Sequence, residues 1–421
     1  MAKIKINRYR VLLIGIRCDD IIQFDKQTRD IHVFMIILQP FMKKSFNTLK
    51  IGMLGGGQLG RMLLQKAADF SLNIKVLDPD PSAPCRSLAD EFINGSFNDH
   101  DTVYAFGKSC DLVTIEIEHV NVEALKKLES EGIAVYPQPG VIGLVQDKGD
   151  QKRFFSMHNI PTAAYELIEC RDDLLKVNLK FPLIQKLRKG GYDGKGVYKV
   201  LQASDIKNSF DAPCVVEEMV LFKKELSVIV SRNISGECIC FPAVEMVFNE
   251  EANLVEYLFS PAEVNTEIET RARNLAIHVA ESINIVGVLA VEMFLTEDDK
   301  LLVNEIAPRP HNSGHHTIEA NITSQYEQHL RAILGMPLGH TDILFPAVMV
   351  NLLGEKNYDG IASYINIDEA LSIDGVYVHL YGKKFTRPFR KMGHVTIIAK
   401  TIQEAKTKAE KIKNSLKVIS E

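Results

Sequence analysis

The stretch from 50 to 80, KIGMLGGGQLGRMLLQKAADFSLNIKVLDPD, constrains the fold of this 421-residue chain more than any other. An apolar run ends at Leu54, glycines follow it, and an apolar stripe with helical spacing comes next. The glycines are Gly55, Gly57 and Gly60, and the stripe comprises Leu59, Met62, Leu63, Ala67 and Phe70. A second apolar run, 73–77, leads to Asp78. This order predicts a β-α-β unit of a parallel α/β sheet.

The same stretch does not specify a ligand. Glycines at a strand-to-helix turn allow any anion to approach the helix N-terminus, so the pattern suits a dinucleotide without being specific for one. Asp78 stands where an acid holds a ribose hydroxyl in such enzymes. An NAD-dependent dehydrogenase that binds its cofactor at 55–60 therefore stays open as one hypothesis.

The composition is that of an ordinary soluble protein, with 46% hydrophobic and 24% charged residues. A chain of 421 residues exceeds what one core usually holds, so roughly two or three domains are expected. The net charge of -5 argues against a general nucleic-acid binder but leaves room for a basic pocket that takes one phosphorylated small molecule. No segment is apolar enough for a membrane role, and seven cysteines without a CxxC pair favour free thiols in a reducing cytoplasm.

The first residues show no helical or strand period. Their apolar run, 31–38, lies too far from the start for a signal peptide. Met42 is followed by Lys-Lys-Ser and directly precedes the first good strand. We interpret residues 1–48 as an N-terminal extension outside the fold and Met42 as the natural start, a hypothesis that an intact Met1 in the native protein's mass would remove.

The pattern changes along the chain. Strands and helices alternate up to about residue 139, and hairpins replace them beyond 181. One hairpin is expected to pair 225–230 with 237–244 across Gly236. Another is expected to pair 288–295 with 301–306 across 297–299. A long helix is predicted over 268–283, and an amphipathic helix near the end carries Ile402, Ala405, Ala409 and Ile412.

A second glycine-rich loop, KGGYDGKG at 189–196, lies between two predicted strands. Its four glycines let backbone N–H groups approach phosphate oxygens, and its lysines neutralise their charge. A dehydrogenase has no use for such a hairpin, whereas a triphosphate-binding enzyme has. A flexible exposed hairpin is the alternative interpretation.

Glu292 and Glu305 are predicted to face each other on the hairpin that turns at 298–299. Like charges that face across a strand pair repel, and a cation between them removes the repulsion. Mg²⁺ prefers such a place, with one or two carboxylates and nucleotide oxygens as ligands. The alternative is a solvated pair, but alternation puts apolar residues on the same faces. These are Ala290, Phe294, Leu301 and Val303.

Three further patterns are weaker. The strand from 214 ends in Glu217-Glu218-Met219-Val220, where backbone groups can meet a purine and an acid can hold a ribose, although exposed acids before a loop are common. His311 and His315 have zinc-like spacing, but Asn-Ser-Gly between them favours a loop over a zinc site. The basic cluster at 383–391 is either a phosphate pocket or a solvated face.

Four motifs in order resemble those of the N5-carboxyaminoimidazole ribonucleotide synthases of the ATP-grasp superfamily. They are GGGQLGRM at 55–62, GGYDGKG at 190–196, NEIAPRPHNSGHHT at 304–317 and RPFRKMGH at 387–394. The resemblance covers about residues 50–400. It implies an ATP-grasp fold with a Rossmann-like pre-ATP-grasp domain at 49–143, an ATP-grasp domain with a glycine-rich lid at 144–345 and a small C-terminal domain at 346–421.

The resemblance also implies an activity. Such enzymes carboxylate 5-aminoimidazole ribonucleotide with bicarbonate and ATP through carboxyphosphate, in purine biosynthesis, as Mg²⁺-dependent homodimers. A mutase that uses the product is an implied functional partner. Another ATP-grasp ligase, such as a formate-dependent formyltransferase or a biotin-carboxylase-like enzyme, and a non-catalytic nucleotide sensor remain alternatives.

The matched motifs carry site residues with them. For ATP, the resemblance implies Lys148, Lys186, Gly191, Tyr192, Asp193, Gly194, Lys195, Gly196, Val197, Glu217, Glu218, Met219, Val220, Glu225, Asn304 and Glu305. For the ribonucleotide it implies Gln58, Leu59, Glu118, Tyr192, Asp193, His311, Asn312, Lys383, Arg390 and Lys391. Catalytic roles fall to Asp193, Lys195, Arg309 and Lys383, and the metal ligands are Glu292 and Glu305.

The sequence departs from the family pattern at two places. Phe389 replaces the central glycine of the usual RPGRKMGH, which raises the question of that loop's backbone. Met246 and Phe248 stand where the family often has Asn and His. Neither departure touches the glycine loop, the acid pair or the segment around Arg309.

Overall fold

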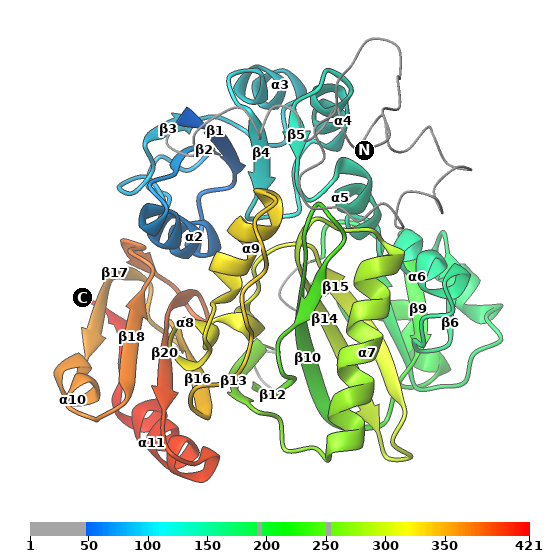
Figure 1. The fold of residues 1–421 in the computed structure, drawn as a ribbon. Coiled ribbons are helices and arrows are strands. Elements are labelled where there is room, and N and C mark those ends of the chain that lie inside the picture. The colour runs from blue at the N-terminus through cyan, green and yellow to red at the C-terminus, as the bar shows by residue number, and fades with distance from the viewer. Residues whose placement is uncertain (1–47, 192–195, 250–253) are drawn as a thin grey trace, which may run out of the picture. The chain divides into compact units, whose positions relative to one another are not determined.

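The computed structural model describes residues 48–191, 196–249 and 254–421. The first part is a five-stranded parallel sheet in the order β3-β2-β1-β4-β5, which confirms the predicted β-α-β unit (Figure 1). Its strands are β1 (Lys50–Leu54), β2 (Asn73–Asp78), β3 (Glu91–Asn94), β4 (Leu112–Ile115) and β5 (Ala134–Val135). Its helices are α2 (Gln58–Asp69), α3 (His100–Lys108), α4 (Val122–Ser130) and α5 (Pro139–Val145).

A four-stranded antiparallel sheet follows, in the order β6-β9-β7-β8. The strands are β6 (Tyr165–Ile168), β7 (Leu183–Leu187), β8 (Val197–Val200) and β9 (Cys214–Glu218). Two 3-10 turns, η5 (Arg171–Leu175) and η6 (Ala203–Asn208), pack with it. The helix α6 (Lys148–Met157) precedes this sheet and begins at Asp147, whose side chain accepts the N–H groups of Gly149 and Asp150.

A nine-stranded sheet forms the rest of the chain's framework, in the order β15-β14-β10-β12-β13-β16-β20-β18 with β11 beside β10. Its strands are β10 (Phe222–Arg232), β11 (Cys238–Cys240), β12 (Val244–Asn249), β13 (Leu254–Ser260), β14 (Gly287–Thr296), β15 (Leu301–Ala307), β16 (Ala347–Leu353), β18 (Val376–Leu380) and β20 (Lys391–Ile398). Strands from the predicted C-terminal domain therefore continue the sheet that carries the acid pair.

Helices cover this sheet on both faces. The long helix α7 (Thr266–Ser282) packs Ala272, Ala276 and Val279 on β10 and β14 (Figure 1). The helix α9 (Gln325–Ile333) also contacts β10 and β14, and α11 (Ile402–Ser415) packs on β16 and β20. The remaining elements are η7 (Asn312–Gly314), α8 (Thr317–Ala320), α10 (Ile367–Leu371) and the small sheet of β17 (Gly360–Ile365), β19 (Phe385–Thr386) and β21 (Lys417–Ser420).

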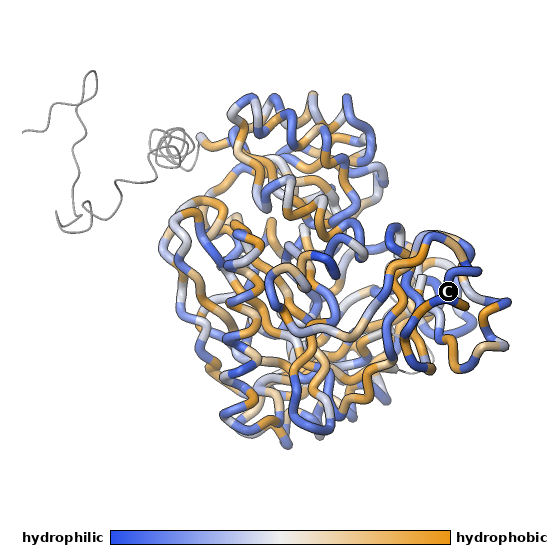
Figure 2. Tube along the Cα trace, turned by 90° about the vertical axis from the view of Figure 1, so that its right-hand side faces the viewer, coloured by the Kyte–Doolittle hydropathy of each residue, from blue (hydrophilic) through white to orange (hydrophobic). Residues whose placement is uncertain are grey.

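Hydrophobic segments of the tube drawn in Figure 2 lie mostly towards its inside, and hydrophilic residues are frequent along its outer edge. The cysteines at 85, 110, 170, 214, 238 and 240 are free thiols. Among the described residues, no helix is long and apolar enough to cross a membrane.

The hairpin across Gly236 differs from the prediction. Gly236 does turn the chain, with φ of +87°, and β11 pairs with β10. However, the expected strand 237–244 is broken: β11 ends at Cys240, and β12 starts at Val244 and pairs with the other half of β10. Pro242 lies in the break, where a residue without a backbone N–H cannot continue a central ladder.

The hairpin of β14 and β15 confirms the predicted register, because Glu292 pairs with Glu305. The expectation that Leu301 and Val303 share the glutamates' face is wrong. The register shifts next to Glu292, where Val303 pairs with Met293 and leaves Asn304 as an extra residue. This bulge reverses the alternation, so Val303 and Leu301 join the core under α7 instead.

Candidate active site

The acid pair lies on adjacent strands with a different partner for each carboxylate. The Lys148 ammonium is 2.5 Å from Glu305 Oε2, and His311 Nε2 is 3.4 Å from Glu292 Oε1. Attraction to Lys148 lowers the pKa of Glu305 to about 2. Burial and the facing Glu305 raise the pKa of Glu292 well above its usual range. Without a cation, the pair therefore favours a proton on Glu292 and a charge on Glu305.

A chain of alternating charges runs from this pair into the four-stranded sheet. Lys186 on β7 donates to Asn304 Oδ1 at 2.8 Å and lies 2.8 Å from Glu217 Oε2. Burial alone would raise the pKa of Glu217, but Lys186 and Lys152 lower it to about 2. Lys186 and Glu217 are thus in direct contact. The sequence placed both at the ATP site only through the family resemblance.

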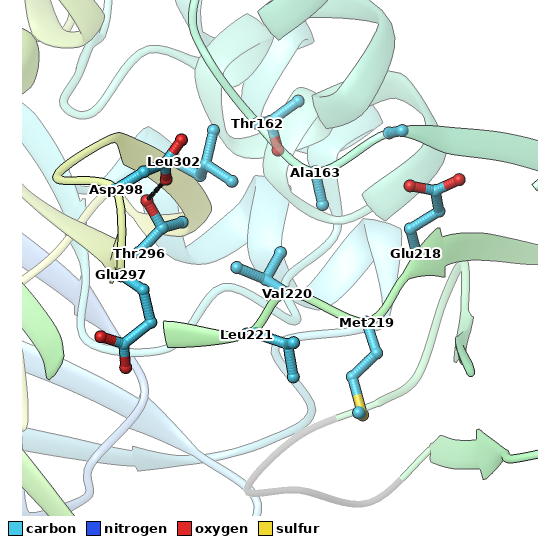
Figure 3. A pocket seen from close by; sticks show the side chains of 11 residues that line it. Thr162, Ala163, Glu218, Met219, Val220, Leu221, Thr296, Glu297, Asp298 and Leu302 are labelled. Atoms are coloured by element: carbon cyan, nitrogen blue, oxygen red, sulfur yellow. Dashed lines mark hydrogen bonds between the residues drawn. The ribbon is translucent and has the colours of Figure 1, made fainter. Parts of the chain in front are cut away.

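A pocket of about 380 Å³ opens beside the connector after β9 (Figure 3). Three predicted nucleotide residues, Glu218, Met219 and Val220, line it. Glu217 does not line it, because its carboxylate turns towards the two lysines. The other lining residues are Thr162, Ala163, Ala164, Leu221, Thr296, Glu297, Asp298 and Leu302, none of which the sequence pattern indicated.

Glu225 lies near the acid pair on β10. It is buried, and burial together with the Glu305 charge raises its pKa to about 7. Its strand neighbours are Met246 and Phe294. Met246, one of the departures from the family pattern, is buried among Val244, Leu258 and Met349, so it packs the sheet at that position.

The segment after β15 brings predicted substrate residues together across the chain. Arg309 Nη2 lies 2.7 Å from Glu118 Oε1, beyond the end of β4. His311 presents Nε2 to Glu292 while its Nδ1 lies 2.9 Å from Ser313 Oγ. Asn312 begins η7 beside them. His315 pairs instead with Tyr326 Oη at 2.9 Å, so His311 and His315 face different partners.

The basic cluster reaches the same region from β20. Lys383 donates to the Lys391 carbonyl at 2.7 Å, and Arg390 donates to the Phe385 carbonyl at 2.6 Å. Lys391 is near enough to lower the pKa of Glu292 against the larger effect of burial. Phe389 adopts φ of +61°, so the loop keeps the left-handed backbone that a glycine would take there.

The first glycine loop is closed by two internal carboxylates. Gly56 N–H donates to Asp78 Oδ2 at 2.6 Å, and Gly60 N–H donates to Glu116 Oε2 at 3.2 Å. A Cβ on Gly57 would lie 2.8 Å from Glu116 Oε1, so the glycine is needed to admit that side chain. Of the predicted substrate residues here, Leu59 is buried and Gln58 is partly exposed.

The second glycine loop is described only at its ends. Tyr192, Asp193, Gly194 and Lys195 lie outside the described residues. Gly191 and Gly196 approach each other closely, since a Cβ on Gly196 would lie 3.1 Å from Gly191 Cα, and Gly196 has φ of +80°. Leu187 N–H donates to the Gly196 carbonyl, and β8 continues from Val197. The loop therefore leaves the sheet at the end of β7, next to Lys186.

Three family models match in order along the chain. They describe a ribonucleotide synthetase preATP-grasp domain (48–146), an ATP-grasp domain (153–326) and a phosphoribosylaminoimidazole carboxylase C-terminal domain (347–408). The N5-carboxyaminoimidazole ribonucleotide synthase of Bacillus subtilis is 38% identical over 355 residues, which cover 83% of this chain and 91% of the relative. The chain belongs to the N5-carboxyaminoimidazole ribonucleotide synthase family. Longer relatives named phosphoribosylaminoimidazole carboxylase also match, and the chain spans 64% and 65% of two of them.

Solved structures agree with this family. The N5-carboxyaminoimidazole ribonucleotide synthetase of Thermotoga maritima is 43% identical with a TM-score of 0.83, covering 89% of this chain and 100% of that one. The Aspergillus clavatus N5-carboxyaminoimidazole synthase, solved with ADP and 5-aminoimidazole ribonucleotide, is 35% identical with a TM-score of 0.80, covering 88% and 99%. The predicted ATP-grasp fold with pre-ATP-grasp and C-terminal domains is confirmed.

The sequence did not predict several buried side chains that contact the expected site residues. Lys152 contacts Glu217, Arg188 forms a two-pronged pair with Asp147 at the start of α6, and Glu116 fills the first glycine loop. One signal was present for Lys152, because it follows Lys148 by four residues and so lies on the same helix face. The other contacts are not visible in any local spacing.

Proposed function

We propose that this chain is an ATP-dependent ligase that carboxylates 5-aminoimidazole ribonucleotide with bicarbonate, giving N5-carboxyaminoimidazole ribonucleotide, ADP and phosphate in purine biosynthesis. One observation carries the proposal beyond family membership. The carboxylates of Glu292 and Glu305 face each other between a lysine for phosphate and a histidine from the substrate segment. A dehydrogenase has no use for this arrangement, and carboxylates already fill its expected cofactor loop.

The ATP site runs from the pocket to the acid pair. The purine and ribose are proposed to lie against the connector 218–220 and near Glu217 and Glu225, and the phosphates against Lys148, Lys186 and Asn304. The lid that the glycine-rich motif predicts would close over the phosphates, with Gly191, Gly196 and Val197 at its two ends. Its residues Tyr192, Asp193, Gly194 and Lys195 lie outside the described residues. Such closure is useful because an acyl phosphate formed from bicarbonate hydrolyses readily in water.

The acid pair fits Mg²⁺. Burial and the facing Glu305 raise the pKa of Glu292, a cost that a bound cation would offset, and carboxylate oxygens are the ligands Mg²⁺ prefers. Among the described residues, no group of three or more His, Cys, Asp or Glu is arranged to hold a metal, so the protein offers Glu292 and Glu305 and leaves other positions to nucleotide oxygens and water. A bound Mg²⁺ supplies charge neutralisation for phosphoryl transfer.

The ribonucleotide is proposed to bind between the first glycine loop and the basic cluster. Lys383, Arg390 and Lys391 would hold its phosphate, and Gln58, Leu59 and Glu118 would contact its other end. Arg309, His311 and Asn312 would orient bicarbonate and the amine. Asp193 and Lys195 complete the catalytic set, with Asp193 accepting the proton that the attacking amine loses.

The remaining expectations are part of the same proposal. Domain boundaries fall near residues 143 and 345, and the enzyme acts as a cytoplasmic homodimer. Its product passes to a mutase. No nucleic acid or membrane takes part. Up to residue 47, the extension predicted for residues 1–48 lies outside the described residues, which begin at Thr48.

The test is ADP release with purified protein. Release is expected only when Mg-ATP, bicarbonate and 5-aminoimidazole ribonucleotide are all present, and replacing the acceptor separates this ligase from other ATP-grasp enzymes. ADP release that ignores the ribonucleotide contradicts the proposal. A thermal-shift comparison of Mg-ATP with NAD separates it from the dehydrogenase, which predicts stabilisation by NAD alone.

A further inference from the structure

Lys152 is a buried cation that the proposed mechanism does not use. It lies on α6 one turn after Lys148, and its side chain is only 4% exposed. Its ammonium lies 2.8 Å from Glu217 Oε1 and donates to Thr162 Oγ1 at 2.5 Å. A buried ammonium is costly unless such partners compensate it, so its place next to Glu217 needs a reason.

Glu217 is held from two sides. Lys152 approaches one carboxylate oxygen, and Lys186 approaches the other at 2.8 Å. Lys186 also donates to Asn304, which lies directly beside Glu305. A single carboxylate is therefore shared by a lysine that faces the proposed phosphates and a lysine that faces the protein interior.

The sharing determines how strongly Glu217 binds Lys186. If Lys152 lost its charge, Lys186 alone would neutralise the buried carboxylate, and their attraction would hold the Lys186 ammonium more tightly. Lys152 does not line the pocket beside the connector, and its ammonium is turned towards Glu217 and Thr162. Thr162 Oγ1, which accepts a hydrogen bond from Lys152, does line the pocket and donates to the Val303 carbonyl at 2.6 Å.

We propose that Lys152 is a positioning residue for ATP: it neutralises Glu217 from the interior side and so leaves the charge of Lys186 available to Asn304 and to the nucleotide phosphates. The inference rests on the proposed function in taking ATP as the ligand. It assigns a role to a side chain that contacts neither substrate nor metal.

The first experiment measures binding without turnover. Calorimetry with Mg-ADP and with adenosine compares the wild type, Lys152→Met and Lys152→Arg. We expect Lys152→Met to weaken Mg-ADP binding about tenfold and adenosine binding less than threefold, because the effect acts on phosphates. Arginine keeps the charge and should stay within about threefold of the wild type for both ligands. Equal losses for ADP and adenosine, or no loss for ADP, overturn the proposal.

A second background keeps the test valid if the buried methionine destabilises the fold. In Glu217→Gln the carboxylate charge is absent, so adding Lys152→Met should then change Mg-ADP affinity less than about threefold. The same tenfold loss in both backgrounds contradicts the mechanism, since it would not depend on Glu217. Circular dichroism and melting curves of each variant confirm that folded protein is compared.

A pH profile gives a readout that a purely structural lysine would not move. Burial lowers the pKa of Lys152 to about 8, with Glu217 on β9, Lys186 on β7, Lys148 on its own helix and Tyr165 on β6 facing it. Lys152 is protonated below pH 8 and loses its charge above pH 8. The affinity of the wild type for Mg-ADP should therefore fall above pH 8, whereas that of Lys152→Arg should not change with pH. A level wild-type profile counts against the proposal.

These outcomes separate the inference from the proposed function. Wild-type protein that binds Mg-ADP but shows no ribonucleotide-dependent turnover refutes the proposed reaction, whereas the Lys152 effects on ADP still support the inference. Wild-type turnover together with an unchanged Lys152→Met refutes the inference alone.

Discussion

The first glycine loop and the β14–β15 hairpin both bury carboxylates, yet they use them in opposite ways. At the glycine loop, Asp78 and Glu116 accept backbone N–H groups that cannot move away. On the hairpin, Glu292 and Glu305 face each other and pair with side chains, His311 and Lys148, which can reorient. Carboxylates fixed by backbone donors hold a loop in its conformation, and carboxylates that repel one another leave a place for a cation.

The largest effect should come from removing one member of the facing pair. Glu305→Gln eliminates the charge that pairs with Lys148 and is proposed to bind Mg²⁺, so kcat is expected to fall on the order of 10³-fold. Steady-state ADP release measures it. Glu267→Gln, whose parent side chain is 79% exposed, serves as the matched control and should keep full activity. A Glu305→Gln enzyme within threefold of the wild type would break the comparison.

Substitution of Glu116 at the first glycine loop should reduce the stability of the fold. Glu116→Leu leaves the buried Gly60 N–H without its acceptor, and we expect it to lower the free energy of unfolding by about 1–3 kcal/mol. Glu116→Gln keeps an oxygen acceptor and should cost less than about 1 kcal/mol. Urea denaturation compares the two. Equal stability of the Leu and Gln variants would show that the Gly60 N–H does not depend on this side chain.

Glu225 gives a pH-dependent test of the acids near the hairpin. Its pKa is raised to about 7 by burial and by Glu305, so folding favours its protonated form. Its contribution to stability is full below the unfolded pKa of about 4.5 and is lost as pH rises through 7. Between pH 4.5 and 8 the wild type should therefore lose up to about 3 kcal/mol relative to Glu225→Gln. Urea denaturation at each pH measures this difference. If the free energies of unfolding of the two proteins change with pH in the same way, the raised pKa of Glu225 is contradicted.

The smallest effect is a change in stability at a single backbone position, Phe389, which stands where the family has a glycine. Phe389 has φ of +61°, which a glycine adopts without strain. Phe389→Gly should raise the free energy of unfolding by about 0.5–1 kcal/mol, whereas Phe389→Ala keeps the strained φ and should not. Thermal unfolding of the pair distinguishes them, and a more stable alanine variant would place the strain elsewhere.

Much of the fold and part of the site could be predicted from the sequence because they depend on the local spacing of apolar residues, glycines and turns. The strand–glycine–helix order predicted the parallel sheet, and counting from the turn at 298–299 predicted the Glu292–Glu305 pair. The same counting placed Val303 on the wrong face, because nothing local marks Asn304 as an extra residue. Alternation predicts which face a side chain occupies only up to a bulge, and beyond the bulge the faces are exchanged.

What the sequence could not show are contacts between distant segments. Glu116 reaches the glycine loop from β4, and Arg309 meets Glu118 across more than half of the described chain. Such pairs depend on how separate elements pack, so neither glycine spacing nor charge pattern encodes them. The dehydrogenase hypothesis was locally reasonable for this reason, and it is the contacts of distant segments, the filled first glycine loop and the facing acid pair, that argue against it.

The shared nine-stranded sheet has a mechanical consequence. Glu292 on β14 and Lys391 on β20 belong to one sheet, in which β10, β12, β13 and β16 pair in turn between them, so separating them would require interstrand hydrogen bonds to break. The span between the proposed phosphate-transfer end and the proposed ribonucleotide end is therefore set by a stiff template. The four-stranded sheet is a separate ladder, so no pairing between the described strands ties it to this template.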